Sequence, residues 1–200
     1  MIANARTDSI CHARRRSLNF CGLAVVLSLT GMPVHAESAV PLDVPYVPTP
    51  QLVAERMLKM ARVGRSDVVY DLGCGDGRLV ITAAKKHGAR GVGIDIDPAR
   101  IRQAQARAKA ARVENRVEFI LGDLFQADLA RATVVTLYLL PRINRQLRPQ
   151  LWQQLAVGTR VVSHGFDMGE EWPPERTETV DGSPIYYWTI TEAHKKPAKG

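Results

Sequence analysis

Beyond residue 64 the chain alternates short apolar runs with longer amphipathic stretches. The short runs are rich in Val and Ile, which favour extended structure, so they predict strands over 67–71, 91–95, 116–121, 133–140 and 159–163. The stretches between them have apolar residues at helical spacing and predict helices over 78–87, 98–113 and 141–155. Because strands separated by helices pair in parallel, this rhythm predicts an α/β fold with a doubly wound, mostly parallel sheet.

The flanks of this pattern predict different structures. Residues 175–180 and 184–191 follow one another without a helix, which predicts an antiparallel C-terminal hairpin. Residues 37–50 contain four prolines, so they predict an extended lead-in, and an amphipathic helix over 51–62 follows. We therefore expect a lead-in and covering helix over 37–63, one domain over 64–192, and a flexible tail over 193–200.

The first 36 residues form a pattern of their own. Arginines at 14–16 precede an apolar run over 20–34, and Val34-His35-Ala36 offers the small side chains of a cleavage site. This pattern is typical of a secretory signal peptide, and the run is shorter than the ~20 residues that span a bilayer. Cleavage of this segment after Ala36 is favoured over its retention as an N-terminal membrane segment. We expect an exported protein, periplasmic or associated with the inner membrane; a mitochondrial presequence is the alternative in a eukaryote.

Composition narrows the classes of function. Charged residues make up 24% of the chain and the hydrophobic class 46%, which excludes a disordered chain and a polytopic membrane protein. The formal net charge of +7 falls to 23 − 19 = +4 without residues 1–36, too mild to imply a nucleic-acid partner. Cys74 is the only cysteine after residue 36, and no Cys/His cluster has metal-ligand spacing, so we expect neither an internal disulfide nor a metal.

Three aspartates fall at the ends of three successive predicted strands. Asp71 begins the sequence DLGCGDGR, whose glycines permit a tight turn and the close approach of a ligand. Asp95 ends the second strand and Asp123 follows the third. Ligands of open α/β sheets bind at the carboxyl edge of the strands, so we expect one crevice lined by these acids, suited to a cationic nucleoside. Each aspartate alone also suits a helix N-cap or a turn, but those roles do not explain their common edge.

The glycine loop and the strand-end acids resemble class I S-adenosylmethionine-dependent methyltransferases, over roughly residues 64–165. The resemblance implies a Rossmann-like fold with S-adenosyl-L-methionine as cofactor. It implies that Asp71 lies by the methionine amino group and that the cofactor loop is formed by Gly73, Gly75 and Gly77. Asp95 would bind the ribose hydroxyls, Ile96 would lie beside the adenine, and Asp123 would accept from the adenine amino group. Leu124 is a further candidate for cofactor binding. NAD binding is the competing interpretation, but it requires G-x-G-x-x-G, and the acidic Asp76 disfavours a pyrophosphate.

A wider set of motifs resembles one family of lysine methyltransferases. These motifs are VPYVPTP at 44–50, DLGCGDGR at 71–78, LYLLP at 137–141 and RVVSHGF at 160–166, followed by Trp172-Pro173. The eukaryotic members of that family modify the adenine nucleotide translocase and the ATP synthase c subunit. The resemblance implies an N-methyltransferase that acts on a lysine of another protein. The apolar N-terminal run adds the hypothesis that this substrate protein is embedded in a membrane. A small-molecule methyltransferase and a catalytically silent cofactor-binding domain are the alternatives.

An amine acceptor needs surroundings that favour its neutral form, because a free lysine has a pKa of ~10.4. Tyr138 and His164, at the exits of the fourth and fifth predicted strands, are the candidate catalytic residues. Both residues also have a purely structural interpretation. Tyr138 would then pack in the core, and His164 would be a loop histidine whose hydrogen bonds are made within the protein. Tyr46 and Thr49, in the proline-rich lead-in, are candidates for a flap over the cofactor. The fourth strand is followed by no Asn/Asp-Pro-Pro-Tyr string, so a flipped nucleic-acid base has little support as acceptor.

Overall fold

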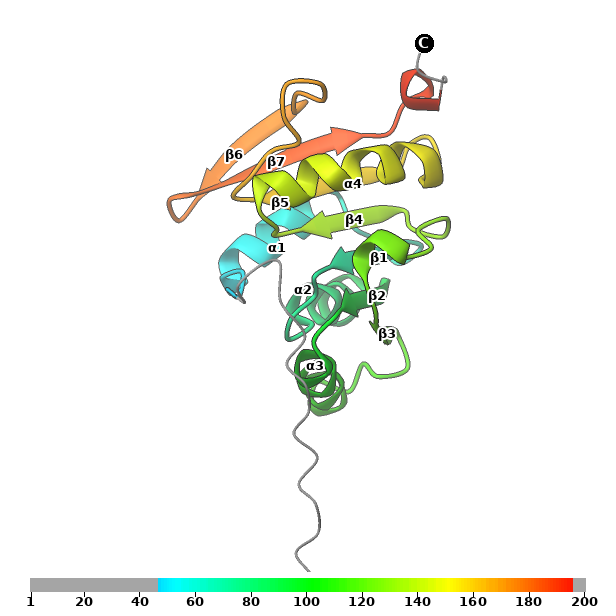
Figure 1. The fold of residues 1–200 in the computed structure, drawn as a ribbon. Helices are drawn as coiled ribbons and strands as arrows, with labels where there is room; N and C mark the ends of the chain where they lie inside the picture. The colour runs from blue at the N-terminus through cyan, green and yellow to red at the C-terminus, as the bar shows by residue number, and fades with distance from the viewer. Residues whose placement is uncertain (1–46, 196–200) are drawn as a thin grey trace, which may run out of the picture. The chain divides into compact units, whose positions relative to one another are not determined.

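A seven-stranded sheet organises residues 47–195, the part of the chain that the computed structural model describes (Figure 1). Its strands, in chain order, are β1 Val68–Leu72, β2 Arg90–Asp95, β3 Val117–Leu121, β4 Val134–Leu137, β5 Arg160–His164, β6 Arg176–Val180 and β7 Ser183–Thr189. The spatial order is β3-β2-β1-β4-β5-β7-β6, with β1 to β5 parallel and β7 antiparallel to both β5 and β6. The predicted α/β fold with its antiparallel closing hairpin is confirmed. The predicted signal segment and Tyr46 lie outside the described residues.

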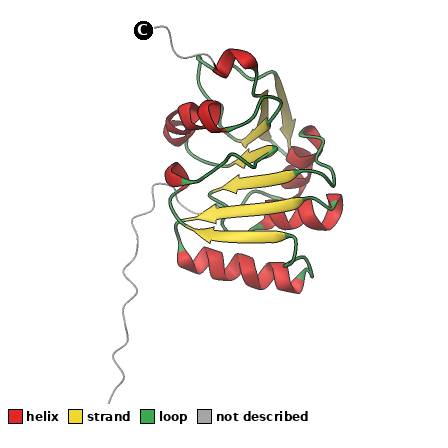
Figure 2. Cartoon of the chain, turned by 90° about the vertical axis from the view of Figure 1, so that its right-hand side faces the viewer, coloured by secondary structure: helices red, strands yellow, loops and turns green. Residues whose placement is uncertain are grey.

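Helices cover both faces of the sheet (Figure 2). They are α1 Gln51–Met60, α2 Arg78–Thr82 with its π-helical continuation η1 Ala83–His87, α3 Pro98–Ala110, α4 Pro141–Gln154, and the 3-10 turns η2 Leu124–Gln126 and η3 Glu192–Lys195. Side chains alternate along each strand, so β1 buries Val69 among residues of α1 and α2 and buries Tyr70 on the face that α4 covers. Figure 1 shows α4 crossing one face of the sheet.

The fourth strand is shorter than the sequence predicts. Its pairing with β1 and with β5 ends at Leu137, and the chain then turns to begin α4 at Pro141. The predicted strand over 133–140 was therefore wrong at its end, because the apolar residues 138–140 are used in a turn and not in the ladder. As a result Tyr138 leaves the sheet and lies in the loop at its carboxyl edge.

The predicted tail is also different in its first residues. Glu192–Lys195 forms η3 against α4, with the His194 ring stacked on Trp152 at 5.3 Å between centroids. The Lys195 ammonium donates a hydrogen bond to the Trp152 carbonyl. A basic sequence that suits a solvated tail thus begins with residues that pack on α4, through the His194 ring and the hydrogen bond from Lys195. Within residues 47–195, no helix is long and apolar enough to cross a membrane.

Candidate active site

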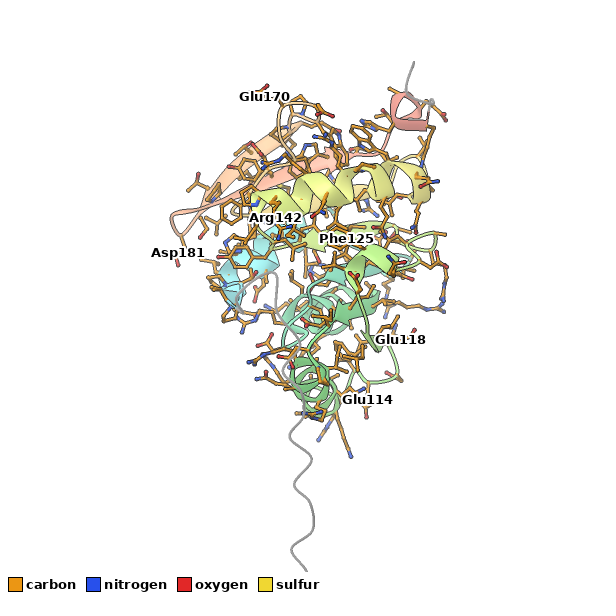
Figure 3. The ribbon with its side chains drawn as sticks, viewed as in Figure 1. Glu114, Glu118, Phe125, Arg142, Glu170 and Asp181 are labelled. Carbon is orange, nitrogen blue, oxygen red and sulfur yellow. The ribbon has the colours of Figure 1, made fainter. Side chains whose placement is uncertain are left out.

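The carboxyl ends of β1 to β4 open into a single cavity with about 1040 Å³ of empty space, part of it at the open mouth. Nine residues that the sequence assigns to the site line this cavity: Thr49, Asp71, Gly73, Gly75, Asp95, Ile96, Asp123, Leu124 and Tyr138. Gly77 and His164 lie behind its wall. Phe125, labelled in Figure 3, lines the cavity from η2 and was not predicted.

The strand order arranges the cavity from one end to the other. Asp123 follows β3, Asp95 ends β2, Asp71 lies on β1 and Tyr138 follows β4. Neighbouring strands lie about 4.8 Å apart, so the sheet edge from β3 to β4 extends about 14 Å. We call the β3–β1 part, with its three carboxylates, the cofactor end, and the part beside β4, with Tyr138, the acceptor end.

Asp95 shapes the glycine loop that it faces. Its Oδ2 accepts a hydrogen bond from the Gly75 amide at 2.7 Å, and its Oδ1 accepts one from the Asp97 amide at 3.0 Å. Asp123 likewise accepts from the Phe125 amide at 2.9 Å and caps η2. Asp95 and Asp123 therefore both stabilise local turns and line the cavity.

Asp71 and Asp76 are the most buried acids of the cavity, each with 3% of its surface exposed. Burial, assisted by the charges of Asp95 and Asp76, raises the pKa of Asp71 to about 7, although the hydrogen bond from the Thr136 hydroxyl (2.7 Å) lowers it. A cationic ligand placed here would therefore restore the carboxylate form of Asp71.

The glycines of the loop have different functions. Gly73 has φ +78°, and a Cβ there would lie 2.9 Å from Leu139 Cδ2, so its bare backbone lets the loop approach the residues after β4. Gly77 has φ +74°, and a Cβ there would lie 2.6 Å from the Phe119 ring of β3. Gly77 thus supports packing behind the loop, whereas the sequence interpretation placed it with Gly73 and Gly75 around the cofactor.

Arg78 is a member of the site that the sequence interpretation missed. Its Nε and Nη2 donate to the two carboxylate oxygens of the buried Asp76, at 3.0 and 2.6 Å. Burial opposes ionisation of Asp76, but these hydrogen bonds and the charges of Arg78 and Arg107 hold its pKa below the usual range. Because two arginines balance this carboxylate, Asp76 alone is a weaker argument against a pyrophosphate than the sequence suggested. The sequence did offer a signal for Arg78, since it is the last residue of the motif DLGCGDGR.

The acceptor end is apolar and backed by a histidine. Tyr138 is half-buried, and Leu139 and Ile143 complete this wall of the cavity. The His164 ring lies 3.8 Å from the Tyr138 ring between centroids and is itself 3% exposed. Burial lowers the pKa of His164, which favours a neutral imidazole at pH 7. His164 therefore contacts the wall of the cavity and not its interior, contrary to its predicted place among the catalytic residues.

Thr49 is the point where the lead-in meets both ends of the cavity. Its Oγ1 lies 3.2 Å from His164 Nδ1, and its carbonyl oxygen accepts a hydrogen bond from Arg78 Nη1 at 2.6 Å. Cys74 lies in the loop nearby, and burial raises its pKa, so it is a thiol and not a thiolate at neutral pH. Across residues 47–195 no group of three or more His, Cys, Asp or Glu side chains could hold a metal ion.

The residues of the cavity fit S-adenosylmethionine. Apolar surface from Ile96, Leu124 and Phe125 lies beside strand-end carboxylates that can accept hydrogen bonds from hydroxyl and amino groups. The bare backbone at Gly73 and Gly75 allows a ligand to approach the loop closely. The buried Asp71 suits an ammonium group.

Residues 71–176 match the family model of the ANTKMT methyltransferase domain. The chain is 46% identical over 156 residues to a protein-lysine N-methyltransferase of Saccharolobus islandicus, a match that covers 76% of this chain and 96% of the relative. It is 32% identical to the Xenopus laevis lysine N-methyltransferase of the ATP synthase c subunit, over 77% of this chain and 67% of the relative.

A solved structure from Salinibacter ruber, described as an RNA methyltransferase in complex with S-adenosyl-L-homocysteine, superposes with a TM-score of 0.73. It is 56% identical to this chain, and the match covers 77% of this chain and 98% of the Salinibacter chain. The demethylated cofactor in that structure agrees with the ligand that the cavity here fits.

Proposed function

The chain belongs to the ANTKMT methyltransferase family and is an S-adenosylmethionine-dependent methyltransferase, and from this premise we propose that it methylates the side-chain amine of a protein lysine. The observation that carries the proposal is the 46% identity to a protein-lysine N-methyltransferase across 96% of that relative's length. The apolar acceptor end of the cavity supports it on chemical grounds.

A lysine must lose its proton before it can accept a methyl group, because an ammonium has no lone pair. The cofactor supplies the methyl group on a sulfonium, which makes that carbon an electrophile. Tyr138, Leu139 and Ile143 offer the amine an apolar surface, which penalises the ammonium form and so favours the neutral amine. The same wall can hold the aliphatic stem of the lysine, and such positioning can contribute several kcal/mol to the lowering of the barrier.

We further propose that the acceptor is a protein of the membrane and that this enzyme is exported or membrane-associated. The apolar run at 20–34 is separated from Val47 by 12 residues, which extend to at most about 45 Å. Val47 and Pro48 line the cavity, so in a chain that retains the apolar run, whatever the run binds would be tethered within that distance of the cavity. A lysine near a bilayer surface lies within that reach.

RNA is the second candidate acceptor, favoured by the description of the Salinibacter structure. Against it, the sequence from the last residue of β4 onward is LYLLP, which offers no side-chain amide or carboxylate to the edge of a splayed base. A small-molecule amine is the third candidate, since the cavity itself does not require a macromolecule.

The test is transfer of tritiated methyl groups from S-adenosylmethionine by the purified full-length protein to membranes, soluble protein, RNA and metabolites of its own cell. We expect label in a discrete membrane-protein band, stable to acid and base, and recovery of methyl-lysine after hydrolysis. Label confined to soluble protein would overturn the membrane proposal alone. Label that ribonuclease removes, or label in small molecules only, would overturn the lysine proposal.

The Asp95→Ala variant is the control for this assay, because it removes the acceptor of the Gly75 amide in the cofactor loop. Loss of both cofactor binding and label in this variant would assign the transfer to this cavity. Cofactor binding by the wild type without transfer to any fraction would favour a catalytically silent binding domain.

A further inference from the structure

The two ends of the cavity are joined by one residue that approaches from outside the sheet. Thr49 lies just before α1, and 5% of its surface is exposed. It uses its backbone toward the cofactor end and its side chain toward the acceptor end. The two interactions can therefore be removed separately.

The backbone interaction reaches the cofactor loop through Arg78. The Thr49 carbonyl accepts from Arg78 Nη1 at 2.6 Å, and the same guanidinium binds both oxygens of Asp76, the loop residue between Gly75 and Gly77. Arg107 of α3 forms a second ion pair with Asp76. The loop is thus tied to Thr49 through a buried carboxylate, whose charge-assisted hydrogen bonds are stronger than neutral ones.

The side-chain interaction reaches the acceptor wall through His164. Thr49 Oγ1 lies 3.2 Å from His164 Nδ1, and the imidazole lies against the Tyr138 ring. Another side of the Tyr138 ring faces the backbone of Gly165, where a Cβ would lie 3.2 Å from Tyr138 Cε2. With the imidazole behind it and backbone beside it, the Tyr138 ring has little room to move unless His164 moves.

We propose that Thr49 and His164 are positioning residues that hold the Tyr138 wall in register with the cofactor loop, so that loading of the cofactor end fixes the geometry of the acceptor end. The proposal rests on methyl transfer in this cavity but not on lysine as the acceptor. Transfer requires the acceptor atom to meet the methyl group in line at about 3–3.5 Å, and a displacement of 1 Å can cost about a hundredfold in rate. A wall that shifts relative to the loop would lower the rate without weakening cofactor binding.

Two substitutions at one position separate this role from packing. Thr49→Val keeps the volume and the backbone bond to Arg78 but removes the hydroxyl; Thr49→Ser keeps the hydroxyl. In the full-length protein we expect Thr49→Val to lower the methyl-transfer rate at saturating cofactor by tenfold or more, with the Kd for S-adenosylhomocysteine changed less than threefold. Thr49→Ser should recover most of the rate. Equal rates for the two variants, or a loss confined to cofactor affinity, would overturn the proposal.

Hydrogen exchange tests the coupling without any acceptor. In the wild type and in Thr49→Ser, S-adenosylhomocysteine should slow exchange of backbone amides in both the loop 71–78 and the segment 160–166. In Thr49→Val, protection of the loop should remain, and protection of 160–166 should fall by at least threefold. Equal protection in Thr49→Val and the wild type would contradict the coupling. If the wild type labels no acceptor, the proposed function fails, and hydrogen exchange still decides whether cofactor binding is coupled to the acceptor end through Thr49.

Discussion

The cofactor end and the acceptor end of the cavity are built in different ways. The cofactor end comes from side chains at or beside the ends of three adjacent parallel strands, and Asp71, Asp95 and Asp123 each stand at the exit of their own strand. The acceptor end comes from three segments far apart in the chain, and Thr49 and His164 are 115 residues apart. The first sets three carboxylates among apolar side chains, whereas the second has an apolar wall that is backed by a buried histidine.

The difference shows how one cavity can bind both S-adenosylmethionine, the ligand common to these methyltransferases, and the methyl acceptor particular to this enzyme. Charge and backbone turns at the strand ends are fixed by the fold, because parallel strands present their carboxyl ends together. The acceptor wall is fixed by contacts among the lead-in, the loop after β4 and the end of β5. The contrast predicts that substitutions at one end should change cofactor affinity, and that substitutions at the other should change rate.

The largest effect is expected for Asp95→Ala at the cofactor end. It removes a charged acceptor from the Gly75 and Asp97 amides and from the ligand, so the Kd for S-adenosylhomocysteine should rise by about a hundredfold or more. Isothermal titration calorimetry measures this. Asp128→Ala is the matched control, since Asp128 accepts from the Ala130 amide in a similar turn but does not line the cavity. If Asp95→Ala changed this Kd by less than fivefold, the proposed difference between the two ends of the cavity would be wrong.

Gly77→Ala should affect stability and spare the cofactor, although Gly77 belongs to the same loop. The new Cβ would meet the Phe119 ring at a positive φ, which should cost about 2–3 kcal/mol of unfolding free energy in denaturant melts. Gly182→Ala shares the positive φ but meets nothing within 4 Å, so its cost should stay near 1 kcal/mol. The sequence interpretation of Gly77 would be right, and ours wrong, if Gly77→Ala weakened cofactor binding at unchanged stability.

Tyr138→Ala probes the acceptor end directly. Removing the ring deletes the wall that lies against His164, so the transfer rate at saturating cofactor should fall about 30-fold, a loss of roughly 2 kcal/mol of barrier lowering. The Kd for S-adenosylhomocysteine should change less than threefold. Tyr138→Phe keeps the ring and should retain the rate within about fivefold. A loss in Tyr138→Phe as large as that in Tyr138→Ala would assign the effect to the hydroxyl.

The smallest effect is a pH dependence of cofactor binding. With its pKa raised to about 7, Asp71 of the free protein binds a proton at pH 6 and has lost it at pH 8. A ligand ammonium requires the carboxylate, so affinity for S-adenosylhomocysteine should increase about tenfold from pH 6 to pH 8, and Asp71→Asn should remove the slope. The stability of the free protein follows the opposite sign: the contribution of Asp71 is complete below about pH 4 and is lost as the pH rises through 7. Flat affinity in the wild type would show either that Asp71 does not meet a cation or that its carboxyl is already ionised at pH 6.

The sequence predicts the features that are local. Apolar runs of five to eight residues predicted β1 to β5, and the helix predicted over 98–113 begins at Pro98 in the structure as well. The strand-end acids were readable because each directly adjoins its strand. By contrast, the interactions of Thr49 with Arg78 and His164 join residues 29 and 115 positions apart, and no periodicity encodes such contacts. The contacts of His194 and Lys195 with Trp152 of α4 could not be predicted for the same reason.

The position of Val47 has a practical consequence for handling the enzyme. Because Val47 lines the cavity, an affinity tag or fusion partner joined shortly before it would be attached at the opening that the acceptor must enter. Lys195 contacts Trp152, whereas Ile143 of the same helix lines the cavity, and nine residues of helix separate them by about 14 Å. Labels, surface immobilisation and fused reporters therefore belong at the carboxyl terminus.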